Sequence, residues 1–373
     1  MPQAKQGPLP AEYDRLAEPE VFDRIRRCIE QLGRRLVILG HHYQTDEVLQ
    51  FADFVGDSLK LSQQAAGQRD AEFVVFCGVH FMAESADILT EPGVQVILPH
   101  LEAGCSMADM ATAEQVEQAW PFLTAAADGA TIVPVTYVNS TAEIKAFCGR
   151  HGGACCTSSN APVVIDWALS QGDKVLFLPD QHLGRNTLYQ MGQPLGGMVL
   201  YDPSGPNGGL TAAQVAGAKA ILWDGYCDVH TVFTKEHCQQ ICRADPACRI
   251  LVHPECTWEV FKEADLAGST EFIIETVDRA PDGSHWAIGT ETHLVDRLAR
   301  RHADRLSVRN LAPERSDCRT MGLIDPKHLL WVLDHLVQDR TINRIAVDEP
   351  IRSDATVALE RMLALKPSQP VKG

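Results

Sequence analysis

Three single cysteines lie where a metal centre could be assembled. Each follows an apolar run with the pattern of a buried strand and then a turn. The cysteines are Cys105, Cys227 and Cys318, and the runs before them are Val94–Leu98, Ala220–Trp223 and Leu306–Leu311. We interpret them as the ends of three copies of one structural unit and expect their thiols to meet at a shared centre.

The number and separation of these thiols indicate which metal they could hold. Structural zinc sites usually pair cysteines at short spacing, and this chain has no C-x₂-C. Three converging thiolates suit a [4Fe–4S] cluster in which one iron has no protein ligand. That iron could bind a substrate oxygen or nitrogen as a Lewis acid. Other cysteines compete as ligands, with packing as their alternative role: Cys155, Cys156, Cys238, Cys242 and Cys248.

Candidate acid–base groups follow two of the expected strands. His41 and Tyr43 come after the run 36–39, and His253 and Glu255 come after the run 249–252. A lone histidine is more often structural than catalytic. Because these two histidines end matching strands, we interpret all four side chains as candidates for moving protons.

Hydroxyl-rich turns precede three expected helices. They are Gly56-Asp57-Ser58, Thr157-Ser158-Ser159-Asn160 and Gly268-Ser269-Thr270. Helix capping alone would explain such residues. Free N–H groups at a helix N-terminus also bind phosphate or carboxylate. Both interpretations stay open, and the recurrence at matching positions makes the functional role about as well supported as capping.

The intervals between these features indicate a repeat. From serine to histidine they are 22, 24 and 24 residues (Ser58 to His80, Ser158 to His182, Ser269 to His293), and from histidine to cysteine they are 25, 45 and 25. The long middle value coincides with a Gly/Pro-rich insertion, 203–209. A period of roughly 100 residues is a whole α/β domain. Alternating strands and helices predict parallel sheets covered on both faces, with ligands beyond the carboxyl ends of the strands.

Composition narrows the class of protein. A length of 373 residues allows two or three domains. The net charge of −16 disfavours nucleic acid and anionic membranes as partners. No apolar run could span a bilayer, and no secretory segment is evident. We therefore expect a cytoplasmic protein whose twelve cysteines stay reduced.

The expected domains follow the repeat. The first α/β domain covers 1–120 and includes an N-terminal helix within 11–32. The second covers 121–230 and the third 231–345. Residues 346–373 form a C-terminal helix and a tail, which we expect to be frayed from Lys366.

Several stretches together resemble the quinolinate synthase A family, in its longer form. They are Gly40-His41-His42-Tyr43-Gln44, Ala52–Leu59, Cys77–Glu84, Leu101–Ser106, Tyr137–Ser140, Cys156–Ala161, Leu178–Gly184, Val252–Glu255 and Gly268-Ser269-Thr270. The resemblance covers about residues 35–365. It implies three similar three-layer αβα domains with parallel sheets, in a pseudo-threefold arrangement around an iron–sulfur site.

The resemblance also implies an activity, which is condensation of iminoaspartate with dihydroxyacetone phosphate to quinolinate. Phosphate and water are released, and the product feeds de novo NAD biosynthesis. By motif, Cys105, Cys227 and Cys318 ligate a [4Fe–4S] cluster. Proton transfer falls to Tyr43, Glu255, His41 and His253. Substrate contacts fall to His41, Ser58, Tyr137, Asn139, Ser158, His253, Glu255, Ser269 and Thr270.

The sequence departs from the family pattern at one motif, and two other functions remain possible. Some family members carry C-x₂-C-x₂-C at the last ligand, whereas this chain has Cys318-Arg319-Thr320-Met321, so disulfide regulation there is excluded. An iron–sulfur electron carrier or redox sensor is one alternative, and a zinc hydrolase using His41, His42 and a carboxylate is the other. The expected partners are the two small substrates and, transiently, an aspartate-oxidising enzyme.

Overall fold

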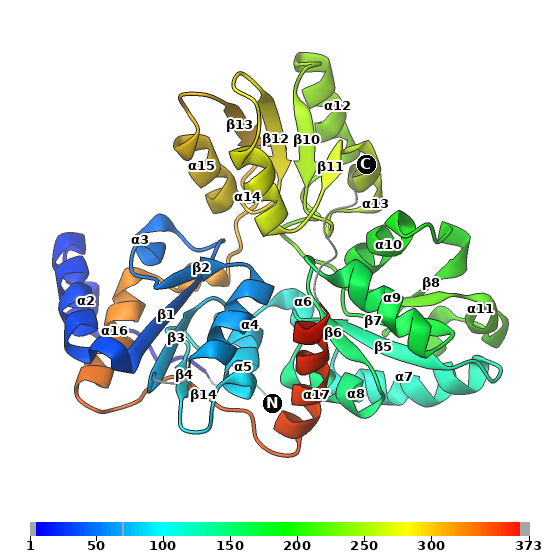
Figure 1. Cartoon of the computed structure of the whole chain (residues 1–373), viewed down its shortest axis with the longest axis horizontal. Coiled ribbons are helices and arrows are strands. Elements are labelled where there is room, and N and C mark those ends of the chain that lie inside the picture. Colours follow the sequence, from blue (N-terminus) through cyan, green and yellow to red (C-terminus); the bar gives the residue numbers. More distant parts are fainter. Residues whose placement is uncertain (1–4, 69–70, 366–373) are drawn as a thin grey trace. The chain divides into compact units, whose positions relative to one another are not determined.

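The computed structural model describes residues 5–68 and 71–365, in which the strands form three sheets (Figure 1). The chain divides into two compact units, one within 1–105 and 317–348 and the other within 106–316 and 349–373. The first unit holds one sheet and the second unit holds two. No helix in the described part of the chain is long and apolar enough to span a bilayer.

The first sheet has the order β14-β4-β3-β1-β2. Its strands are β1 (Leu36–His41), β2 (Phe54–Gly56), β3 (Phe73–Cys77), β4 (Gln95–Ile97) and β14 (Arg344–Ile345). Strands β1 to β4 are parallel, and β14 pairs antiparallel with β4. Its helices are α1 (Ala11–Asp14), α2 (Glu18–Leu32), η1 (Gly33–Arg35), α3 (Asp46–Leu49), α4 (Ser58–Gly67), α5 (His80–Leu89), η4 (Met321–Leu323) and α16 (Pro326–Val337).

The second sheet is wholly parallel, in the order β6-β5-β7-β9-β8. Its strands are β5 (Ile132–Tyr137), β6 (Ala154–Cys156), β7 (Lys174–Leu178), β8 (Met198–Tyr201) and β9 (Ala220–Trp223). The helices of this part are α6 (Ser106–Asp109), α7 (Ala113–Ala126), α8 (Ala142–Arg150), α9 (Ala161–Gln171), α10 (Gln181–Gln190), η2 (Leu195–Gly197), η3 (Pro206–Gly209), α11 (Ala212–Gly217) and α17 (Ile351–Ala364). Helix α17 packs against α8 and β6.

The third sheet is also parallel, in the order β11-β10-β12-β13. Its strands are β10 (Arg249–Val252), β11 (Leu266–Ala267), β12 (His285–Gly289) and β13 (Ser307–Asn310). Its helices are α12 (Lys235–Ala244), α13 (Trp258–Glu263), α14 (Thr270–Asp278) and α15 (Thr292–Arg301). Figure 1 shows helices on both faces of this sheet.

The three sheets share one connectivity, which confirms the predicted repeat and the α/β fold class. Each repeat has four strands that the other two repeats also have. When these four are numbered along the chain, they lie side by side in the sheet in the order 4-3-1-2. They are β1 to β4 in the first repeat, β5, β6, β7 and β9 in the second, and β10 to β13 in the third. Strands β8 and β14 are edge additions. The arrangement of the three repeats about a common centre stays a prediction.

A hydrogen bond repeats between the first two strands of the first and third repeats. The N–H of Ile38 donates to Asp53 Oδ2 at 2.7 Å, and the N–H of Ile250 donates to Asp265 Oδ2 at 2.7 Å. In the second repeat the strand residue is Pro134, which has no N–H to donate. The partner position there is Gly153, where an added Cβ would lie 1.8 Å from the Pro134 oxygen. The second repeat therefore replaces a polar pairing by close backbone contact.

The expected serine caps are correct at one of three helices. Ser269 caps α14, accepting from the N–H of Phe272. At α4 the cap is Asp57 rather than Ser58, because its carboxylate accepts the Lys60 N–H. Helix α9 begins after Asn160, whose side chain makes no capping bond to the helix.

The domain boundaries stay predictions, but the topology refines them. Strand β14, within the expected third domain, pairs with β4 of the first sheet. Helix α17, within the expected C-terminal segment, packs on the second repeat. The tail expected from Lys366 lies outside the described residues.

Candidate active site and cysteine ligands

The twelve cysteines differ in how far they are exposed to solvent. Only Cys105, Cys227 and Cys318 are half-buried. Cys242 is exposed, and the buried group comprises Cys28, Cys77, Cys148, Cys155, Cys156, Cys238, Cys248 and Cys256. The thiols that the spacing singled out are thus neither sealed in a core nor fully open to solvent.

Burial disfavours the thiolate form of several buried cysteines. It raises the pKa of Cys77 and of Cys155 to about 12, and a metal ligand must be a thiolate. The Cys238–Cys242 pair on α12 does not present one face, because Cys238 is buried and Cys242 is exposed. Burial also raises the pKa of Cys238 to about 11.

Each half-buried cysteine follows the fourth common strand of its repeat. Cys105 lies between β4 and α6, Cys227 follows β9, and Cys318 follows β13. The Cys227 carbonyl accepts from the N–H of His230 and the Cys318 carbonyl from that of Gly322, so both cysteines lie at turns. The convergence of the three thiols stays a prediction.

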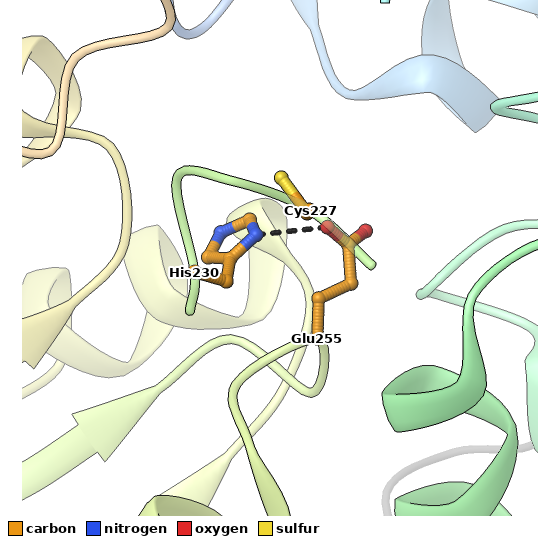
Figure 2. A group of neighbouring side chains, drawn as sticks. All are labelled: Cys227, His230 and Glu255. Carbon is orange, nitrogen blue, oxygen red and sulfur yellow. Dashed lines mark hydrogen bonds and ion pairs between the residues drawn. The ribbon is translucent and has the colours of Figure 1, made fainter. Parts of the chain in front are cut away.

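Glu255 lies within reach of Cys227 and of a histidine that the sequence analysis missed. One donor atom from each of Cys227, His230 and Glu255 lies within 4.8 Å of the others (Figure 2). His230 Nδ1 lies 2.8 Å from Glu255 Oε2, and both residues are no more than 2% exposed. The separation Cys227-x-x-His230 at a turn was the available signal for His230.

His253 extends this buried group. Its ring stacks on that of His230, with centroids 4.4 Å apart and planes at 16°. Its Nε2 lies 3.2 Å from Ser158 Oγ, on the loop after β6. His230 Nε2 lies 3.3 Å from Thr290 Oγ1, another residue that the sequence analysis missed. Residues from two sheets therefore form one polar network.

The surroundings set the charge of Glu255 and His253. Burial opposes ionisation of Glu255, but His253 and His230, with hydrogen bonds from His230 and Tyr137, outweigh it and lower its pKa to about 2. Burial lowers the pKa of His253 to about 3. At neutral pH Glu255 is therefore a carboxylate and His253 a neutral imidazole.

A second buried carboxyl, Asp180, behaves in the opposite way. Burial, with the nearby charge of Glu255, raises its pKa well above the usual range. Its Oδ1 accepts the N–H groups of His182 and Leu183, whereas its Oδ2 is buried and has no partner in the described chain. Asp180 lies in the stretch Pro179–His182, where the sequence analysis singled out the histidine.

The register of the sheets places the predicted strand-end residues at equivalent positions. Residues 39, 135 and 251 each pair with the first residue of the next strand. The equivalent pairs are therefore His41 with Tyr43, Tyr137 with Asn139, and His253 with Glu255. The N–H of Tyr43 lies 3.2 Å from His41 Nδ1, and that of Glu255 lies 3.4 Å from His253 Nδ1.

The structure brings four of the predicted site residues together within the second unit. Tyr137, Ser158, His253 and Glu255 form one network. Asn139 Oδ1 is buried without a partner in the described chain, and Ser269 and Thr270 are buried at the start of α14. His41, Tyr43 and Ser58 belong to the first unit, as do Cys105 and Cys318. Their placement beside Glu255 remains a prediction.

Three repeats with parallel strands, polar residues at matched strand ends and half-buried thiols define an α/β protein. One group of its side chains, Cys227 with His230 and Glu255, could hold a metal ion. The family model described as "Quinolinate synthetase A protein" matches residues 23–364. The chain belongs to this family.

Curated relatives cover nearly the whole chain. A protein of Anoxybacillus flavithermus named quinolinate synthase is 53% identical over 356 residues, which are 95% of this chain and 96% of that protein. A Nocardioides quinolinate synthase is 54% identical over 363 residues, covering 95% and 92%. One from Streptomyces coelicolor is 51% identical over 367 residues, covering 98% and 93%.

Proposed function

We propose that this chain is a quinolinate synthase, which condenses iminoaspartate with dihydroxyacetone phosphate and releases phosphate and water. The observation that carries the proposal is identity above 50% to proteins of that name, along 95% of the chain or more. The product would enter de novo NAD biosynthesis. An aspartate-oxidising enzyme would supply iminoaspartate through a transient contact. We place the enzyme in the cytoplasm, where a reducing environment would keep its twelve cysteines reduced.

We propose Cys105, Cys227 and Cys318 as the ligands of a [4Fe–4S] cluster. The donor set fits, because three half-buried thiols occur at one repeated position while the other cysteines are sealed or exposed. When bound, such a cluster supplies a Lewis acid at the iron that has no protein ligand. Carboxylate and imidazole groups lie beside Cys227, where the dicarboxylate substrate would bind.

Glu255 is the proposed base of the reaction. It is ionised at neutral pH, buried, and fixed by His230 and Tyr137. A neutral His253 can donate a hydrogen bond to a substrate oxygen and so assist proton transfer there. Tyr43 and His41 would carry protons in the remaining isomerisation and dehydration steps.

Uncharged groups would bind the substrates. Asn139 has a buried oxygen without a partner in the described chain, which suits acceptance of a substrate N–H. Ser158 and Tyr137 border the Glu255 network. The hydroxyls of Ser58, Ser269 and Thr270 lie at the starts of α4 and α14, where free N–H groups favour phosphate or carboxylate.

The zinc-hydrolase alternative has less support. Within the described residues, no group of three His, Cys, Asp or Glu donors contains His41 or His42. An electron carrier would not need the buried acid–base network around Glu255.

The test is anaerobic purification, followed by metal analysis and incubation with the two substrates. About four irons per chain together with quinolinate formation would support the proposal. Zinc in place of iron would favour the hydrolase. Iron without quinolinate formation would favour the carrier or sensor.

A further inference from the structure

We propose that Asn186 is a positioning residue for Glu255, which acts through the main chain on either side of that carboxylate. Asn186 Nδ2 donates to the Pro254 carbonyl at 2.9 Å and to the Cys256 carbonyl at 2.8 Å. These two peptide oxygens bracket Glu255. The inference rests on the proposed function, because it concerns the base of that reaction.

The orientation of the Asn186 amide indicates that only its donors are used. The side chain is fully buried on α10. Its Oδ1 has no partner in the described chain, whereas its Nδ2 serves two carbonyls. A buried acceptor without a partner is unfavourable, so the value of an amide here lies in its two N–H groups. Aspartate has nearly the same shape but cannot make these donations when ionised.

Asn186 is itself held against the second sheet. The Asp180 side chain caps α10, and the N–H of Gln181 donates to the Gly225 carbonyl at 2.9 Å. At Gly184 an added Cβ would lie 2.7 Å from a Phe177 ring carbon, so the helix backbone packs closely on β7. Asn186 is therefore fixed to the sheet that carries Tyr137.

The loop that Asn186 contacts belongs to the third sheet, between β10 and α13. Its own turn is closed by a backbone bond from the N–H of Cys256 to the His253 carbonyl at 3.0 Å, beside the longer contact of the Glu255 N–H with His253 Nδ1. The Asn186 amide adds two bonds from the second repeat. It thereby sets the position of the Glu255 carboxylate relative to Tyr137. Misplacing a catalytic group by about 1 Å can reduce a rate about 100-fold.

The experiment compares Asn186→Asp with Leu188→Ala, each in the wild-type and Glu255→Gln backgrounds of the iron-loaded protein. Leu188 is buried on the same helix and makes none of these bonds, so it controls for lost stability. We expect Asn186→Asp to lower kcat about 10- to 100-fold, with KM and iron content unchanged. In the Glu255→Gln background the same change should lower kcat no further. Leu188→Ala should lower the melting temperature only.

Hydrogen exchange of the peptide 253–257 provides a readout that needs no turnover. Asn186→Asp should speed exchange in this peptide, and Leu188→Ala should not. If Asn186→Asp does not fold, Asn186→Ser, which keeps one donor, should show an intermediate loss of kcat. Three results would overturn the proposal. They are a wild-type kcat in Asn186→Asp, a loss of kcat in Asn186→Asp that adds to the loss in Glu255→Gln, and unchanged hydrogen exchange in the peptide 253–257. Absence of quinolinate in the wild type would instead overturn the proposed function, and hydrogen exchange would still test whether Asn186 positions the loop around Glu255.

Discussion

The second and third repeats share their connectivity, but they contribute different chemistry at the same positions. The strand-end pair is Tyr137 with Asn139 in the second repeat and His253 with Glu255 in the third. One pair offers a phenol and an amide, and the other combines an ionised carboxylate with a neutral imidazole. The topology therefore fixes where a side chain lies, whereas the residue type decides whether it binds or transfers protons.

The largest expected effect separates two cysteines of the third repeat. Cys318→Ser should abolish the cluster and all activity, because a hydroxyl is a poor iron ligand. Cys242→Ser should leave both intact, since this thiol is exposed on α12. Iron content and absorbance after anaerobic purification provide the measurement. Full iron in both variants would show that the ligand assignment is wrong.

The next effect tests the division between the two strand-end pairs. Glu255→Gln should keep iron but lower kcat about 100- to 10,000-fold, because the amide cannot take up a proton. Asn139→Ala should mainly raise KM, because Asn139 would contribute substrate binding. Steady-state kinetics with both substrates would distinguish them. A wild-type rate in Glu255→Gln would remove its role in proton transfer.

A smaller effect concerns the backbone difference between the repeats. Gly153→Ala should destabilise the protein by about 3 kcal/mol, because the new Cβ would lie 1.8 Å from the Pro134 oxygen. Gly217→Ala, where nothing lies within 4 Å, is the matched control and should be neutral. Asp265→Ala should cost about 1.5–3 kcal/mol, through loss of its bond to Ile250. Denaturant unfolding measures all three, and equal stability of the two glycine variants would contradict the close contact.

The smallest effect, when it is measured just below neutral pH, is a pH dependence of stability. Burial holds the pKa of His253 near 3 in the folded protein, against 6.5 for an exposed histidine. As pH falls, the unfolded chain therefore takes up a proton on His253 at a higher pH than the folded protein does. Stability should therefore decline below pH 6.5, by up to about 1.4 kcal/mol per pH unit from this residue. Glu255 adds to the decline only between about pH 4.5 and 2.

His253→Gln should flatten the stability profile between pH 6.5 and 4.5, where Glu255 contributes little. Unfolding free energies of variant and wild type across this range provide the comparison. Parallel curves would show that His253 is not held neutral by burial.

The elements that were predictable from the sequence are those with strong local patterns. Central strands such as β3, β5 and β7 are continuous apolar runs, because parallel sheets are buried on both faces. Short edge strands such as β6 and β11 were missed, because two or three residues carry too little periodicity. The expected match of three histidines was also inexact: His182 and His293 lie two residues after their caps, Asp180 and Glu291, but His80 follows Val79 directly.

The sequence alone determined the threefold repetition, the α/β class, the candidate cysteines and the strand-end acid–base residues, because each is encoded in a local pattern that recurs. The tertiary structure decided that Glu255 is ionised and His253 neutral, and that His230, Asp180 and Asn186 surround them. It also decided that β14 joins the first sheet and α17 packs on the second. The physical reason is that burial and hydrogen bonding between residues distant in the chain set these properties, and neither leaves a periodic trace in the sequence.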